Sequence, residues 1–236
     1  MELKDISFED FDVDKVTIYK EKLDSIFEYN LDINKTAYLN WRTRYNDSRQ
    51  QFVIMGEAFF STAYNLLQQC LIDNSDKKAD LWIFPIMFNI IHGMEVYLKA
   101  INSALHVLLE KEDNIIFGGH DLKIISKHAH ELIVEYKEKN QDEASFQFLE
   151  GIQIVENFIS NIYKKTDDMT FVRYPLDRNK KGHFYIEALN NVIIDLELLK
   201  EQVLYIFNML DFTFNELSLR LEQRTDYLAE MMKYYE

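Results

Sequence analysis

Glycine and proline are scarce in this chain. Its 236 residues include 6 Gly and 2 Pro, where average usage would give roughly 16 and 12. Sandwiches, barrels and glycine-rich phosphate-binding loops depend on tight turns built from these two residues. Hydrophobic residues make up 47% of the chain, which is enough for a packed core. The sequence therefore predicts an all-α protein.

The charge limits what the surface can bind. The chain has 26 Lys and Arg against 40 Asp and Glu, so its net charge is −14 at pH 7. A field of that sign repels phosphate backbones, and contact with nucleic acid would need a local basic patch. The N-terminus lacks a signal-peptide pattern, and the apolar run 81–91 is too short to span a bilayer. We expect a soluble, cytoplasmic protein without membrane contact.

Helical periodicity recurs over most of the chain. Apolar residues spaced three and four apart predict helices over 13–29, 41–72, 79–110, 122–139 and 143–165. An irregular stretch follows at 166–182, and one or two long helices are predicted from residue 183 to the end. We expect residues 1–40 to form an acidic helical extension and residues 41–236 to form a single helical bundle with long C-terminal helices.

Two apolar stripes are predicted to pack against other helices. The first lies on the helix over 41–72 and the second on the C-terminal helices, where the spacing is typical of a bundle seam. The first stripe comprises Phe52, Met55, Phe59, Ala63, Leu66 and Cys70, and the second Leu196, Leu199, Val203, Ile206 and Leu210.

A polar stripe interrupts the most apolar predicted helix. His92, Glu95 and Lys99 follow one another at i, i+3 and i+7, so they share one face of the helix over 79–110. Glu95 and Lys99 would form an ordinary i, i+4 ion pair if this face lies at the helix edge. Alternatively, the stripe lines a cleft between helices. The pattern alone leaves both interpretations open.

Motifs of metal and cofactor sites are missing from the sequence. It contains no GxGxxG, GxxxxGK[ST], HExxH or CxxC. His128 and His130 would point about 200° apart on one helix and could not share a metal in the usual i, i+4 manner. Together with His120 they are expected on a solvated helix face, and His106 at the surface or its boundary. We expect neither a metal nor a cofactor.

The irregular stretch is the one locally basic part of the chain. Residues 164–183 carry six Lys or Arg and three Asp, a local charge of +3. Within it, Arg178 is followed five residues later by His183. A histidine can move a proton at the ribose 2′-hydroxyl, and an arginine can hold the phosphate, so this pair suits RNA cleavage without a metal. The alternative is a basic turn in which His183 merely begins a helix.

Three sequence segments together resemble one protein family. FPIMFNIIHGMEVYLKAI (84–101), GGHDLKIISKHA (118–129) and FVRYPLDRNKKGH (171–183) occur in this order. The chain thereby resembles the HEPN superfamily of helical nucleotide-associated domains. The resemblance covers roughly residues 41–210. The resemblance implies a bundle of four or five helices that commonly dimerises. Many members are metal-independent endoribonucleases of toxin–antitoxin, CRISPR-linked or phage-defence systems.

The resemblance also implies roles for individual residues. The family signature is R-x(4–6)-H, which Arg178 and His183 match. By this analogy Arg178 would bind the scissile phosphate, His183 would act as general acid or base and Asn179 would orient the site, in a cleft shared by two copies. His183 should then be partly exposed. The residues expected to contact substrate are Arg173, Tyr174, Lys180, Lys181, His92, Glu95 and Lys99.

Two functions therefore remain open from the sequence. The first is a metal-independent endoribonuclease of a toxin–antitoxin or antiviral defence system. It would cleave RNA, with tRNA among the candidates, as a homodimer that an antitoxin or defence partner protein would regulate. The second is a catalytically inactive HEPN-like module for dimerisation, protein interaction or nucleotide sensing.

Overall fold

The computed structural model describes residues 26–27 and 30–233. The chain divides into two compact units, Met1–Trp41 and Arg42–Glu236. In the described part of the first unit, the 3-10 helix η3 (Ile33–Lys35) follows Asp32, whose side chain accepts a hydrogen bond from the Asn34 amide. The helix predicted over 13–29 lies outside the described residues, apart from a bend at 26–27.

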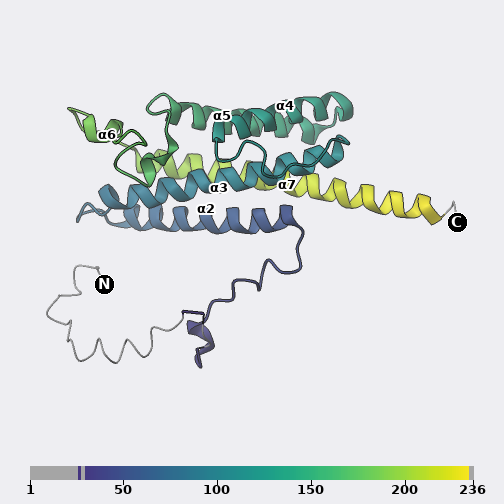
Figure 1. Cartoon of the computed structure of the whole chain (residues 1–236), viewed down its shortest axis with the longest axis horizontal. Coiled ribbons are helices and arrows are strands. Elements are labelled where there is room, and N and C mark those ends of the chain that lie inside the picture. The colour runs from purple at the N-terminus through teal and green to yellow at the C-terminus, as the bar shows by residue number, and fades with distance from the viewer. Residues whose placement is uncertain (1–25, 28–29, 234–236) are drawn as a thin grey trace. The chain divides into compact units, whose positions relative to one another are not determined.

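The second unit is a bundle of long helices (Figure 1). Its described residues contain no β-strand, so the predicted all-α class is confirmed. The long helices are α2 (Ser48–Ile72), α3 (Ala79–Leu108), α4 (Leu122–Asn140), α5 (Glu143–Tyr163) and α7 (Leu196–Lys233), and the short ones η4 (Met169–Val172) and α6 (Phe184–Glu187).

Helix α3 is the centre of this bundle. It packs against α2, α4, α7 and η4, and every residue from Gly93 to His106 is buried. Figure 1 shows α2 along one side of α3 and the α4–α5 pair along the other. Among the described helices only α3 is long and apolar enough to span a membrane, but 56% of its apolar window is buried inside the protein. The central helix of a globular protein can have the same length and apolar composition.

The buried face of α2 differs from the predicted stripe. Met55 is exposed, and the buried face of α2 is rotated by about one residue from the predicted stripe. Two close contacts with α3, each involving a glycine, lie on this buried face. A Cβ at Gly56 would collide with the Tyr97 ring, and one at Gly93 would lie 2.9 Å from the ring of Phe60. The close approach of α2 and α3 therefore requires glycine at both of these positions. The buried residues of α2 are Val53, Gly56, Phe60, Ala63, Leu67 and Cys70.

The helix boundaries follow local capping signals. Helix α2 begins seven residues later than predicted because the Asp47 side chain accepts a hydrogen bond from the Gln50 amide. Asp121 likewise caps α4, after a turn in which Gly118 and Gly119 have φ angles of 78° and 58°. The predicted helices at α3, α4 and α5 are confirmed within two residues at each end.

The C-terminal region is less helical than predicted. Residues 188–195 are not helical, although they contain neither Gly nor Pro. Two Asn followed by Val192, Ile193 and Ile194 have low helix propensity, which accounts for the break. In α7, Leu199, Val203, Ile206 and Leu210 are buried in the core of the same chain. The predicted seam therefore packs within the chain.

Candidate functional site

A buried carboxylate on α3 joins three other polar side chains. Glu95 Oε1 accepts a hydrogen bond from Lys99 Nζ at 2.7 Å and another from His120 Nδ1 at 2.8 Å. Its second oxygen, Oε2, lies 3.5 Å from His92 Nδ1. Three of these residues come from α3 and the fourth from the turn before α4. We call Glu95, Lys99, His92 and His120 the α3–α4 polar cluster.

The cluster corrects the helix-edge interpretation of this stripe. Glu95 and Lys99 do form the i, i+4 ion pair, but each is only 6% exposed. Removing both charges from water is costly unless they are paired and hydrogen-bonded, as they are here. The stripe therefore lies at an interface between helices and meets a residue 25 positions further along the chain.

Glu95 is held as a carboxylate. Burial alone would raise its pKa, but hydrogen bonds from His92, Lys99 and His120 and the charge of Lys99 outweigh it and lower the pKa to about 2. Because this pKa lies below that of the unfolded chain, Glu95 stabilises the fold above about pH 4.3 and loses that contribution as the pH falls towards 2.

His120 is the solvent-facing member of the cluster. Its side chain is 86% exposed although Nδ1 is bonded to a buried carboxylate. A carboxylate can only accept, so Nδ1 carries the proton and Nε2 of the neutral ring is left as a proton acceptor. His92 is less exposed, at 29%, and its ring stacks on Phe88 and meets Phe59 edge-on.

The buried polar stripe of α3 continues beyond this cluster. His106 is buried, so the expectation of a surface position is wrong, and its Nε2 lies 2.8 Å from Nε2 of His128. His130 faces elsewhere and bonds to Glu156 at 2.6 Å. The two α4 histidines thus point apart as predicted. Among the described residues, no three His, Cys, Asp or Glu side chains are placed to hold a metal ion.

The His106–His128 contact predicts a pH-dependent stability. Burial lowers the pKa of His128, the neighbouring His106 and Lys111 lower it further, and Glu131 opposes them. The unfolded chain therefore binds this proton more tightly than the folded protein. Stability should be greatest above about pH 6.5 and fall as the pH drops below it.

Urea denaturation at pH 7.5 and 5.5 measures this effect. The free energy of unfolding should be lower at pH 5.5, and the difference should shrink in His128→Gln, which cannot acquire a proton. An equal pH dependence in both proteins would show that other groups cause it.

The residues of the predicted Arg178–His183 site lie in and directly after a tight turn, over 176–183. Asp177 Oδ1 accepts hydrogen bonds from the amides of Asn179 and Lys181, and a bridge pairs Leu176 with Gly182. Arg178 and Asn179 are exposed. His183, by contrast, is 4% exposed, and its buried Nε2 has no hydrogen-bond partner among the described residues. The expectation of a partly exposed His183 is therefore wrong.

The Asp168 side chain nevertheless interacts electrostatically with both predicted catalytic residues, His183 and Arg178. Burial would raise the pKa of Asp168, but hydrogen bonds from Thr170 and, to a smaller extent, electrostatic interactions with His183 and Arg178 lower it. The two basic groups thus act on the same carboxylate. In this conformation the His183 ring cannot reach an RNA phosphate, so its catalytic role stays a prediction that requires the turn to open.

The other predicted substrate-binding residues lie on the surface. Arg173, Tyr174, Lys180 and Lys181 are exposed, and the Arg173 guanidinium lies 5.7 Å from the centre of the Tyr174 ring. The basic stretch that carries them begins where α5 ends, directly after Tyr163. The Tyr163 hydroxyl lies 3.3 Å from an Asp121 carboxylate oxygen. Because Lys164 follows Tyr163 and Asp121 follows His120, the basic stretch begins close to His120.

Sequence reasoning missed His120 as a member of the site. Its only signal in the sequence is the GHDL segment, which carries the family resemblance but does not indicate a contact with Glu95. No protein-family model, no curated protein and no solved structure matches this chain.

Proposed function

We propose that this protein is a metal-independent endoribonuclease of the HEPN type that acts through the α3–α4 polar cluster. The observation that carries the proposal is the pairing of the exposed His120 imidazole with the buried Glu95 carboxylate. The HEPN resemblance supports the ribonuclease chemistry, although its signature residues are Arg178 and His183; the MEVYLKA and GHDL segments that carry the resemblance contain Glu95, Lys99 and His120.

The cluster contains the groups that RNA transesterification needs. His120 Nε2 takes the proton of a ribose 2′-hydroxyl, and the 2′-oxygen then bonds to the adjacent phosphorus. The bond from phosphorus to the 5′-oxygen breaks, and the imidazolium form of His92 donates the proton on Nε2 to that leaving oxygen while Nδ1 keeps its proton towards Glu95. The products are a 2′,3′-cyclic phosphate and a 5′-hydroxyl.

Glu95 and Lys99 serve as positioning residues in this scheme. Glu95 fixes the His120 tautomer and stabilises the imidazolium that forms, as a buried carboxylate does for a catalytic histidine. Lys99 in turn holds Glu95 in place through the 2.7 Å bond. The exposed cations of the stretch 164–183 would bind the RNA backbone on a surface that is otherwise acidic.

This proposal keeps the predicted chemistry and moves the predicted site. Arg178, with its side chain exposed, remains suited to binding phosphate. A toxin or phage-defence role, a homodimer and a regulatory partner protein remain part of the proposal because the HEPN resemblance implies them, and the cytoplasmic location remains an expectation from the sequence.

The proposal is tested by incubating purified protein with total tRNA and with mixed single-stranded RNA in EDTA. Cleavage with 2′,3′-cyclic phosphate ends is expected. Intact RNA after incubation with folded protein would contradict the proposal. Products with 3′-hydroxyl ends would contradict the transesterification scheme.

A groove between α2 and α7 favours a second candidate, the interaction module. The groove has a volume of about 280 Å³ and is lined mainly by apolar side chains. The lining residues are Glu57, Phe60, Ser61, Tyr64, Val203, Leu204 and Phe207. Under this alternative a second copy of the chain would insert apolar side chains here. Sedimentation velocity of wild type and Leu204→Glu would then show a dimer that the substitution dissociates, without RNA cleavage by either protein.

A further inference from the structure

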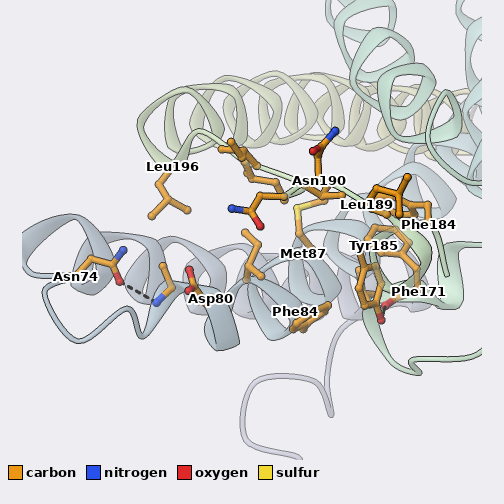
Figure 2. A pocket seen from close by; sticks show the side chains of 18 residues that line it. Asn74, Asp80, Phe84, Met87, Phe171, Phe184, Tyr185, Leu189, Asn190 and Leu196 are labelled. Atoms are coloured by element: carbon orange, nitrogen blue, oxygen red, sulfur yellow. Dashed lines mark hydrogen bonds between the residues drawn. The ribbon is translucent and has the colours of Figure 1, made fainter. Parts of the chain in front are cut away.

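A second pocket lies at the N-terminal end of α3. Its volume is about 570 Å³, within the roughly 300–1,000 Å³ of small-molecule sites. Figure 2 shows Asp80, Phe84 and Met87 on the α3 side of the pocket and Leu189, Asn190 and Leu196 on the side of the segment that leads into α7. Phe171, Phe184 and Tyr185 also line it, so it is strongly aromatic.

The charge of the residues that line the pocket determines which chemical group of a ligand can bind there. None of the eighteen described lining residues is Lys, Arg or His, and Asp80 adds a negative charge. A phosphate group would therefore be repelled. Aromatic side chains such as Phe84 and Tyr185, whose ring centres lie 5.3 Å apart, instead offer a stacking surface for a planar base.

Two polar side chains that line the pocket offer an acceptor and a donor. Asp80 is exposed and has no ion-pair partner among the described residues. Asn74 Oδ1 accepts a hydrogen bond from the Ala79 amide at 2.9 Å, which fixes its side chain and leaves its amino group to donate (Figure 2). A carboxylate and an amide donor are the groups that the edge of guanine requires, because two N–H donors adjoin a carbonyl oxygen there.

We propose that this pocket binds an unpaired guanine base of a single-stranded RNA. The inference rests on the proposed ribonuclease function and names the base recognised by it. Asp80 accepts from the two N–H groups of guanine, the Asn74 amino group donates to its carbonyl oxygen, and the base stacks on the aromatic lining. Single-stranded RNA is commonly recognised in this way, by stacking and by hydrogen bonds to the Watson–Crick edge.

The pocket and the α3–α4 polar cluster lie along one face of α3. Phe84 and Glu95 are eleven residues apart, which places them about 20° apart around the helix and about 16 Å apart along it. Phe88 and His92 fill the interval and stack on each other, with ring centres 5.7 Å apart. In this proposal a strand whose guanine occupies the pocket passes the partly exposed Phe88 and His92 on its way to His120, and cleavage is expected a few nucleotides from that guanine.

Binding of RNA that cannot be cleaved tests the pocket separately from catalysis. The probes are 2′-O-methyl octamers of uridine, one unsubstituted and three with a single central G, A or C, measured by fluorescence anisotropy with the full chain. We expect the G-containing octamer to bind about 10-fold more tightly than the all-U octamer. Asp80→Ala should abolish that preference without weakening all-U binding. The matched control Asp76→Ala removes the same charge outside the pocket and should keep the preference.

The outcomes separate the pocket from the nuclease. Equal binding of all four octamers, or equal effects of Asp80→Ala and Asp76→Ala, would overturn the pocket proposal even if the protein cleaves RNA. A guanine preference that depends on Asp80, in a protein that leaves RNA intact in EDTA, would support the pocket and remove the nuclease. If neither guanine preference nor cleavage is found, both proposals fail.

Discussion

Glu95→Ala is expected to lower the free energy of unfolding by about 3–5 kcal/mol at pH 7. The substitution leaves the Lys99 ammonium group buried without the carboxylate that lies 2.7 Å from it. It also removes the acceptor that orients His120. Urea denaturation followed by circular dichroism measures the stability, and RNA cleavage by the folded fraction should also be lost.

A double variant separates the two consequences. Glu95→Leu combined with Lys99→Leu replaces the buried ion pair by apolar side chains, a change that is often close to neutral in stability. We expect this protein to recover most of the stability lost in Glu95→Ala and still not to cleave RNA. A loss of less than about 1 kcal/mol in Glu95→Ala would contradict a buried, mutually dependent pair.

His120→Ala is expected to slow RNA cleavage by about 10²–10⁴-fold, the usual contribution of a general acid or base. Its stability should fall by about 1–3 kcal/mol, because Glu95 loses one charge-assisted hydrogen bond but keeps the bond from Lys99, so the protein should stay folded. Single-turnover cleavage of one oligoribonucleotide in EDTA gives the rate.

The matched control is His130→Ala. His130 also pairs with a glutamate, Glu156, but lies outside the α3–α4 polar cluster. Its rate should be unchanged. Equal slowing by the two substitutions, or no slowing by His120→Ala, would remove His120 from the reaction.

The helices were predictable where local signals set them. The caps at Asp121 and Asp142 and the glycine turn before α4 depend on neighbours in sequence, and the predicted ends agree with them. The face of α2 was not predictable in the same way, because Gly56 contacts Tyr97 on another helix. The break at 188–195 was missed because weak propensity, and not Gly or Pro, ends the helix there.

The candidate site was predictable only in part, for a related reason. Periodicity along one helix places His92, Glu95 and Lys99 on one face. The bond from His120 to Glu95 joins residues 25 positions apart and depends on how the turn before α4 folds back onto α3. The burial of His183 likewise depends on the tertiary packing of the turn at 176–182, which the spacing of Arg178 and His183 does not reveal.

The location of the proton-transfer site is tested most directly by His183→Ala, compared with wild type in single-turnover cleavage in EDTA. His183→Gln serves as a second variant that keeps more of the buried volume. Both variants should cleave within about 3-fold of the wild-type rate and leave 2′,3′-cyclic phosphate ends, since general acid or base catalysis would contribute at least about 10²-fold. A loss of that size in both folded variants would contradict the assignment to the α3–α4 polar cluster and place the reaction at Arg178 and His183.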